Sequence, residues 1–205
     1  MRKIDKSPEP ESLTKFKESN KGNDWSLIHT DQNKSVYDEC LLQCEVDQNN
    51  LCGYTEVKLE SGVHIDHFVK RDIDPSLTFD WQNMIAAVHD SRFGADFKDS
   101  IVNDDYYDKQ RHEYKTLLNP VTDALKNRFR YSTNGEIEPV SNNDTDAGET
   151  IRVFNLNDSS LCQRRKCAME AARCLLQQMS GEEVLQYMAD AEFPSAIEYE
   201  VSANK

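Results

Sequence analysis

The stretch VHIDHF, residues 63–68, places two histidines and one aspartate within four positions, in a chain of 205 residues that has only five histidines. A carboxylate is a suitable ligand for a hard cation such as Mg²⁺, and an imidazole with a pKa near neutrality can take a proton from water. Hydrolysis of a phosphodiester uses both, because a metal ion stabilises the developing charge while a base activates the nucleophile. His64, Asp66 and His67 are therefore candidate residues of a hydrolytic site.

The candidate residues lie in a predicted β-hairpin. Two short runs, 52–59 and 63–68, alternate apolar and polar residues on either side of a Glu-Ser-Gly turn. Alternate residues of a strand share a face, so His64 and Asp66 point the same way. His67 points to the other face unless the strand ends or twists there.

A helix is predicted over residues 81–89, where apolar side chains recur at helical spacing. Asn83 then lies at the start of the helix, where it can hold the preceding loop or complete the site. His89 and Asp90 follow nearly two turns later. A His-x-Asp-His string also fits a surface strand with ordinary solvated side chains, and the order strand, turn, strand, loop, helix is what favours the functional interpretation.

The rest of the chain predicts an α+β protein with three regions. These are a polar N-terminal arm over 1–33, a core over 34–103 that begins with an amphipathic helix at 34–47, and a mainly helical C-terminal region over 104–205. The other expected elements are a short helix at 11–18, a long charged helix over 104–128 that is interrupted or begins afresh near Pro120, a hairpin of 128–131 and 136–140, a loop at 141–148, an apolar run at 151–156, and helices at 159–178 and 181–191.

Three of these segments together carry a resemblance to a known family. CGYTE (52–56), HIDHF (64–68) and FDWQNM (79–84) resemble the HNH, or ββα-metal, nuclease core, and are similar in particular to the HNH proteins of Septu and retron-associated anti-phage systems. The similarity covers roughly residues 1–175 and includes the opening MRKI, Trp25, Phe129-x-Tyr131, GEI at 135–137 and TIRVFNLN at 150–157. It implies a ββα-metal core embedded in a mainly helical domain with one additional hairpin.

The resemblance also implies a role for each matching residue. Asp66 matches the metal-binding acid of the family, His67 the general base, and Asn83 the asparagine that braces the loop. His64 matches a further family histidine, at the metal site or just behind it. The resemblance thus implies an endonuclease that cuts DNA or a structured RNA such as tRNA.

The last metal ligand of the family lies on or just after the helix, and its identity in this sequence is open. His89 is the first choice, with Asp90 and Asp96 behind it. The implied cofactor is a divalent metal ion, expected to be Mg²⁺ because carboxylate ligands suit it.

The sequence departs from the family at the cysteine pairs that hold a structural zinc. The first pair reads Cys52 and Thr55, and apolar residues stand near the second. One remaining thiol cannot build a four-ligand tetrahedral site, so we expect the zinc to be replaced by apolar packing of Val88, Phe93 and Phe97. A rebuilt zinc site from Cys40, Cys44 and Cys52 is an alternative, although thiols at this spacing are more often core residues. Cys162, Cys167 and Cys174 are likewise expected to be core residues of a helix.

A net charge of −13 opposes binding of this chain alone to a phosphate backbone. The family resemblance implies partners that could supply a basic channel: an ATPase of the same operon, and a reverse transcriptase with its RNA–DNA product. No apolar run approaches the roughly 18 to 20 residues that span a bilayer, and the opening MRKIDKSPEPES lacks the apolar segment of a secretion signal, so we expect a cytoplasmic protein with free thiols and no membrane partner.

Two interpretations from other classes compete with the nuclease. One is a catalytically inactive HNH-fold adaptor that binds the ATPase or nucleic acid. The other is a zinc-binding interaction module, which would carry stoichiometric zinc. The joint presence of Asp66, His67 and Asn83 favours the enzyme, because a pure adaptor has no chemical need for them.

Overall fold

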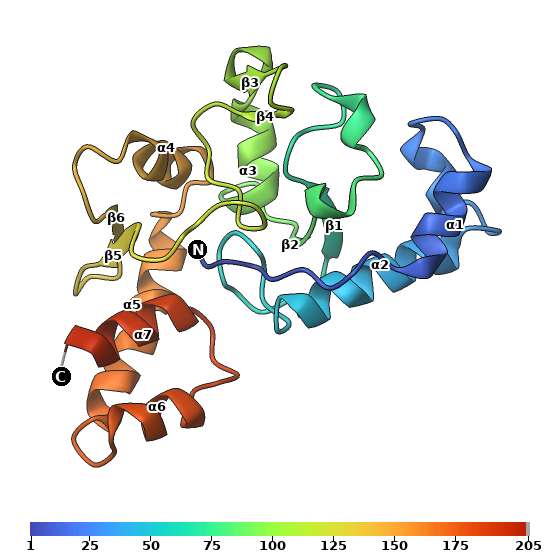
Figure 1. The fold of residues 1–205 in the computed structure, drawn as a ribbon. Helices are drawn as coiled ribbons and strands as arrows, with labels where there is room; N and C mark the ends of the chain where they lie inside the picture. The colour runs from blue at the N-terminus through green and yellow to red at the C-terminus, as the bar shows by residue number, and fades with distance from the viewer. Residues whose placement is uncertain (204–205) are drawn as a thin grey trace.

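A computed structural model describes residues 1–203, and in it the chain is a mixed α+β protein, as predicted. Three pairs of short antiparallel strands lie among the helices of this part of the chain (Figure 1). The central pair joins β1 (Val63–His67) to β2 (Met84–Val88), with His64 opposite Ala87 and His67 opposite Met84. Helix α3 (Gly94–Ile101) follows directly and packs against β2.

The predicted helix over residues 81–89 is wrong. Only Trp81–Asn83 form a short 3₁₀ turn, and the chain then continues as β2. Each residue of Met84–Ala87 is buried, because this strand is covered by core side chains on both faces. A strand buried on both faces reads as a continuous apolar run, which periodicity alone does not separate from a buried helix.

The predicted hairpin between 52–59 and 63–68 is also wrong, because β1 pairs with β2 instead. The earlier segment forms one isolated bridge between Leu51 and Lys58. It reaches the central strands through Gly53, whose amide donates to the carbonyl of Ala86 at 3.1 Å. The backbone hydrogen bonds of β1 are therefore made with β2, which follows a long loop. They are not made with the segment before the Glu-Ser-Gly turn.

Helices α1 (Glu11–Ser19) and α2 (Lys34–Asp47) confirm the prediction for the N-terminal part of the chain. They pack against each other, and α2 covers one side of the β1–β2 pair. The N-terminal segment runs alongside α2 (Figure 1), where Ser7 donates its backbone amide to Asp47 at 3.0 Å. The arm is thus part of the core structure.

The C-terminal region differs more from the prediction. The helix expected over 104–128 is absent from the described chain, where this stretch holds a 3₁₀ turn, strands β3 (Tyr107–Asp108) and β4 (Glu113–Tyr114), and a loop. Its apolar residues are buried in the core without helical spacing, and His112 adopts a positive φ of 55°, which a helix does not allow. The hairpin of β5 (Phe129–Tyr131) and β6 (Ile137–Pro139) confirms its prediction.

Four helices follow in the described part of the chain, up to residue 203. The expected loop at 141–148 is partly wrong, because α4 (Thr145–Val153) begins there with Asp144 as its N-cap, accepting from the amide of Ala147. Helices α5 (Ser159–Leu175) and α6 (Gly181–Tyr187) were predicted, and α7 (Pro194–Ala203) was not. None of the helices between residues 1 and 203 combines the length and the apolar character needed to cross a bilayer.

All six cysteines are free thiols. Cys40 and Cys44 are fully buried between α1, α2 and β2, as core residues of a helix should be. The expectation that the cysteines of α5 are core residues is wrong, because Cys167 and Cys174 are exposed and Cys162 is only partly buried. The buried face of α5 is made by Leu161, Arg165, Met169 and Ala172 instead.

Candidate functional site

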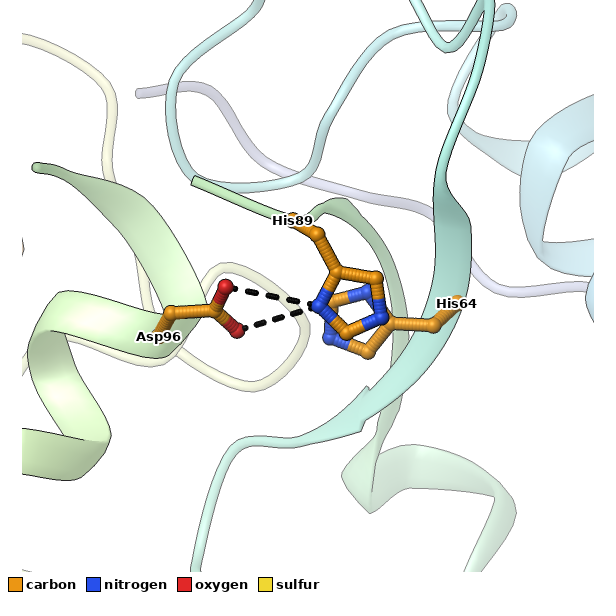
Figure 2. A group of neighbouring side chains, drawn as sticks. All are labelled: His64, His89 and Asp96. Atoms are coloured by element: carbon orange, nitrogen blue, oxygen red, sulfur yellow. Dashed lines mark hydrogen bonds and ion pairs between the residues drawn. The ribbon is translucent and has the colours of Figure 1, made fainter. Parts of the chain in front are cut away.

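Two histidines from neighbouring strands meet at one end of the β1–β2 pair. His64 lies in β1, and His89 follows the last residue of β2, held there by a bond from its amide to the carbonyl of Gly62 at 3.1 Å. Their imidazole rings stack with centroids 3.7 Å apart and planes 9° from parallel (Figure 2). The pairing of β1 with β2 therefore brings together two residues that are 25 positions apart in sequence.

Asp96 completes this group from the first turn of α3. Its carboxylate oxygens lie 3.3 and 3.4 Å from Nδ1 of His89 (Figure 2). One ligand atom from each of His64, His89 and Asp96 lies within 4.8 Å of the others, so the three could hold a metal ion. We refer to these three residues as the His-His-Asp group.

His64 has a feature that fits metal binding. Its Nδ1 atom is buried and has no hydrogen-bond partner in the described part of the chain. Buried polar atoms without partners are rare in proteins, and a bound ion is one of the accepted explanations. Burial also lowers the pKa of His64, which keeps the imidazole in the neutral form that binds metals.

The donor atoms of the His-His-Asp group differ from those expected for Mg²⁺. Two imidazole nitrogens and one carboxylate suit transition metals such as Zn²⁺, Mn²⁺ or Ni²⁺, whereas Mg²⁺ prefers oxygen ligands throughout. Three protein ligands also leave coordination positions open, as in catalytic rather than structural metal sites.

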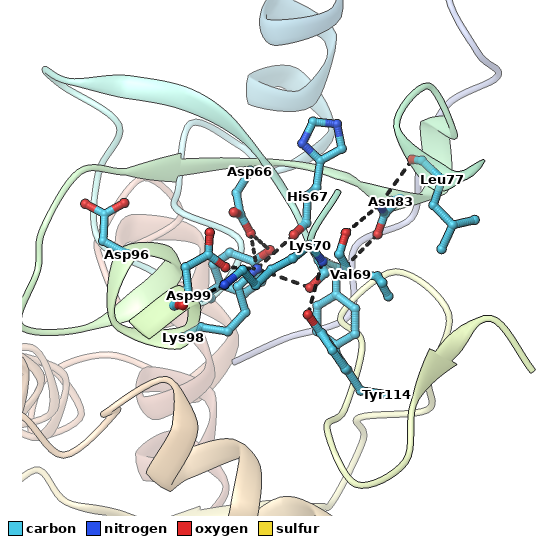
Figure 3. A network of polar contacts seen from close by, with 12 residues as sticks. Asp66, His67, Val69, Lys70, Leu77, Asn83, Asp96, Lys98, Asp99 and Tyr114 are labelled. Carbon is cyan, nitrogen blue, oxygen red and sulfur yellow. Dashed lines mark hydrogen bonds and ion pairs between the residues drawn. The ribbon is translucent and has the colours of Figure 1, made fainter. Parts of the chain in front are cut away.

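Asp66, the expected metal-binding acid, lies outside this group. It is buried on the face of β1 that looks toward α3, and its Oδ2 atom accepts from Nζ of Lys98 at 2.9 Å and from the hydroxyl of Tyr54 (Figure 3). The carboxylate is thus engaged by an internal cation and a phenol.

His67 points away from Asp66 and Lys98, to the other face of β1 (Figure 3). Its ring is buried edge-on against Trp25, with centroids 4.5 Å apart, and its Nε2 atom lies 2.8 Å from the carbonyl oxygen of Thr78. A carbonyl only accepts, so Nε2 carries the proton and Nδ1 holds the lone pair. Burial lowers the pKa of His67 to about 3, so the ring is neutral at pH 7.

Asn83 closes the loop between the two strands. Its Oδ1 atom accepts from the amide of Val69 at 2.8 Å, and its Nδ2 atom donates to the carbonyls of Val69 at 3.1 Å and Leu77 at 3.2 Å (Figure 3). It does so from the 3₁₀ turn before β2 and not from a helix start. The loop that carries Thr78 is therefore fixed at both ends by one side chain.

One cavity of about 250 Å³ joins these features. Its walls include the His-His-Asp group together with Asp66 and His67. The remaining walls come from Ile65, Lys70, Arg71, Asp72 and Asp99.

Two basic residues contribute to this cavity in an otherwise acidic chain. Lys70 donates from Nζ to the carbonyl of Asp99 at 2.9 Å. Arg71 is exposed, with its guanidinium 5.5 Å from the centre of the Trp25 ring, and among residues 1–203 no carboxylate forms an ion pair with it. The cavity is therefore lined by the His-His-Asp group, by His67, and by Lys70 and Arg71 among several aspartates.

Of the three residues expected for the last metal ligand, the structure brings His89 and Asp96 together. Asp90 instead forms an ion pair with Arg92 at 2.6 Å. Lys98, Tyr54 and Arg71 were not singled out from the sequence. A signal for Lys98 was available, because it lies four positions after Gly94 in α3 and shares the buried face of that helix.

No protein-family model matches this chain, and a search of curated proteins finds no relative of it.

Proposed function

We propose that this chain is a metal-dependent endonuclease of the HNH type that hydrolyses phosphodiester bonds of nucleic acid. One observation carries the proposal: a single cavity is lined both by His67, whose imidazole is neutral and has its lone pair on Nδ1, and by the His-His-Asp group. The succession of β1, β2 and α3 around that cavity supports a ββα-metal core, as the sequence resemblance implies.

A metal ion held by the His-His-Asp group would stabilise negative charge on the phosphate that is attacked. His67 supplies the base. Its Nδ1 atom accepts a proton from the attacking water, while Nε2 donates to the carbonyl of Thr78, which stabilises the imidazolium that forms. As the water oxygen bonds to phosphorus, the bond from phosphorus to the leaving sugar oxygen breaks, and that oxygen takes a proton from solvent. The phosphate brings negative charge to the cavity and raises the pKa of His67, which makes the ring a stronger base when substrate is bound.

Asn83 and Arg71 have supporting roles in this proposal. Asn83 fixes the loop that carries Thr78, so the carbonyl that orients His67 stays in place. Arg71 presents a guanidinium at the cavity, and a guanidinium binds phosphate oxygens well because its donors match their geometry.

The net charge of −13 bears on how the substrate is reached. An acidic chain repels free nucleic acid, so we propose that it works in the cytoplasm in a complex that supplies basic surface. The partners implied by the resemblance are an ATPase and a reverse transcriptase with its RNA–DNA product, in an anti-phage system. The substrate is DNA or a structured RNA such as tRNA.

The test is cleavage by the purified chain, alone and with its partner ATPase, of plasmid DNA, single-stranded DNA and tRNA in Mn²⁺ or Mg²⁺. We expect His67→Ala to lower the cleavage rate by about 100-fold or more, the usual contribution of a general base. His29→Ala is the matched control, because His29 is an exposed histidine that does not line the cavity. Cleavage by His67→Ala at the wild-type rate would rule out the proposed role.

The inactive adaptor is the second candidate, and one observation favours it. The carboxylate of Asp66, the expected metal ligand, is engaged by Lys98 and Tyr54 instead. An adaptor would bind the ATPase or nucleic acid with the same affinity after His67→Ala and would cleave neither DNA nor RNA in any complex.

A further inference from the structure

Lys98 is fully buried, with 0% of its surface exposed. A lysine is almost never buried to this extent unless its charge is compensated. Lys98 reaches from α3 to the end of β1, directly beneath the segment that carries Asp66 and His67 (Figure 3). The charge of this buried ammonium must therefore be compensated by groups beside the candidate site.

Four oxygen atoms surround the ammonium of Lys98. They are Oδ2 of Asp66 at 2.9 Å, Oδ1 of Asp99 at 3.0 Å, and the carbonyl oxygens of His67 at 2.8 Å and Phe68 at 3.1 Å. An ammonium has three protons, so its donor capacity is fully used. Burial opposes the charge, but Asp66 and Asp99 outweigh burial and raise the pKa of Lys98 above its usual value.

This set of contacts has two consequences. The Oδ2 atom of Asp66 is shared between Lys98 and Tyr54, so its negative charge is already compensated by an internal ammonium. The carbonyls of His67 and Phe68 are fixed where β1 ends, and this fixes the direction in which the His67 side chain leaves the main chain.

We propose that Lys98 is a positioning residue that keeps Asp66 out of the ligand set of the metal and holds the main chain of His67, so that the metal is bound by His64, His89 and Asp96 alone. The exclusion of Asp66 from the ligand set follows from its contacts with Lys98 and Tyr54, and the role of Lys98 toward His67 rests on the proposed function.

The ligand set is tested by isothermal titration of the metal-free protein with Mn²⁺. Asp66→Asn keeps the shape of the side chain, and we expect its Kd for Mn²⁺ to stay within about threefold of wild type. His64→Ala should weaken Mn²⁺ binding by about tenfold or more, because a ligand is lost. Thermal unfolding of both variants checks that each is folded. Equal losses of affinity in Asp66→Asn and His64→Ala would overturn the proposal, since Asp66 would then be a ligand.

The positioning role is tested with Lys98→Met and with Lys98→Met combined with Asp66→Asn. The single variant leaves Asp66 buried without its cation, whereas the double variant removes both charges and keeps the lysine stem. We expect the double variant to unfold at a higher temperature than the single variant and to keep the wild-type Kd for Mn²⁺. Its kcat for cleavage should fall by about tenfold or more with KM unchanged, because the carbonyls that orient His67 lose their donor.

Wild-type kcat in a folded double variant would overturn the positioning role. If Lys98→Met alone does not fold, the double variant decides the question. If the wild-type chain and its complex cleave no nucleic acid, the proposed function fails, while the Mn²⁺ affinity of Asp66→Asn still tests the ligand set by itself.

Discussion

The imidazole rings of His64 and His89 stack 3.7 Å apart across two paired strands, and only one of the two rings contacts a carboxylate (Figure 2). Burial lowers the pKa of His64, which favours the neutral form of its ring and so avoids a second positive charge at this separation.

The first prediction concerns Asp96, the third member of the His-His-Asp group. Asp96→Asn should weaken Mn²⁺ binding by about tenfold or more, because the carboxylate supplies the only negative charge of the group. Titration calorimetry with Mn²⁺ at pH 7 measures the effect. Asp72→Asn is the matched control, since Asp72 lines the same cavity but lies outside the group. Equal affinities in the two variants would contradict the assignment.

The second prediction concerns pH and His67. The pKa of His67 is about 3 in the folded chain against roughly 6.5 in an unfolded one, so between these values the unfolded state binds one more proton. The free energy of unfolding should therefore fall as pH decreases through this window, by about 1.4 kcal/mol per pH unit from this group. Above pH 7 the contribution is complete and constant.

Urea denaturation at pH 7, 6, 5 and 4 measures this dependence. His67→Asn should show a shallower decrease than wild type, and His29→Asn, at an exposed position, should follow wild type. Identical slopes for wild type and His67→Asn would mean that the ring is protonated at an ordinary pKa.

The third prediction concerns Asn83. Asn83→Ala removes three hydrogen bonds and leaves the amide of Val69 buried without its acceptor, so we expect a loss of about 2 to 4 kcal/mol in the free energy of unfolding. Hydrogen exchange should locate the effect at the amide of Val69. Asn143→Ala, at an exposed position, should change stability by less than about 0.5 kcal/mol. Unchanged exchange at Val69 would argue against a bracing role.

The fourth prediction concerns Arg71. Arg71→Ala should weaken nucleic-acid binding and reduce the slope of log affinity against log salt by about 1, because one phosphate contact is lost. Fluorescence anisotropy of a labelled oligonucleotide with the chain in its complex measures both quantities. Lys109→Ala removes an equal charge at an exposed position outside the cavity and should leave the slope unchanged. Equal slopes for wild type, Arg71→Ala and Lys109→Ala would mean that Arg71 does not contact a phosphate.

The sequence predicted the elements whose patterns are local. Helix α2 (Lys34–Asp47) and the β5–β6 hairpin follow from apolar spacing and an Asn-Gly turn, which act over a few residues. Strand β2 did not follow, because its apolar residues face core on both sides and so lack a period of two. The helix expected over 104–128 did not follow either, because the buried residues of this stretch belong to a 3₁₀ turn, two short strands and a loop.

The candidate site shows the same difference between residues found from local patterns and residues placed by tertiary contacts. His64, Asp66, His67 and Asn83 were found because they lie close together in a recognisable string. Their partners depend on tertiary contacts: His64 meets His89 only when β1 pairs with β2, and Asp66 meets Lys98 only when α3 docks beneath it. The sequence alone therefore ranks the candidate ligand residues, but only the fold shows which of them lie together.

The His-His-Asp group has one further consequence, which follows from where its members come from. Each of the three lies on a different segment, β1, the end of β2 and α3, so an ion bound there would act as a cross-link between them. Detachment of α3 would remove Asp96 from the group and so break the cross-link. A bound ion would therefore stabilise the state in which α3 is docked, and depletion of the metal would remove that stabilisation.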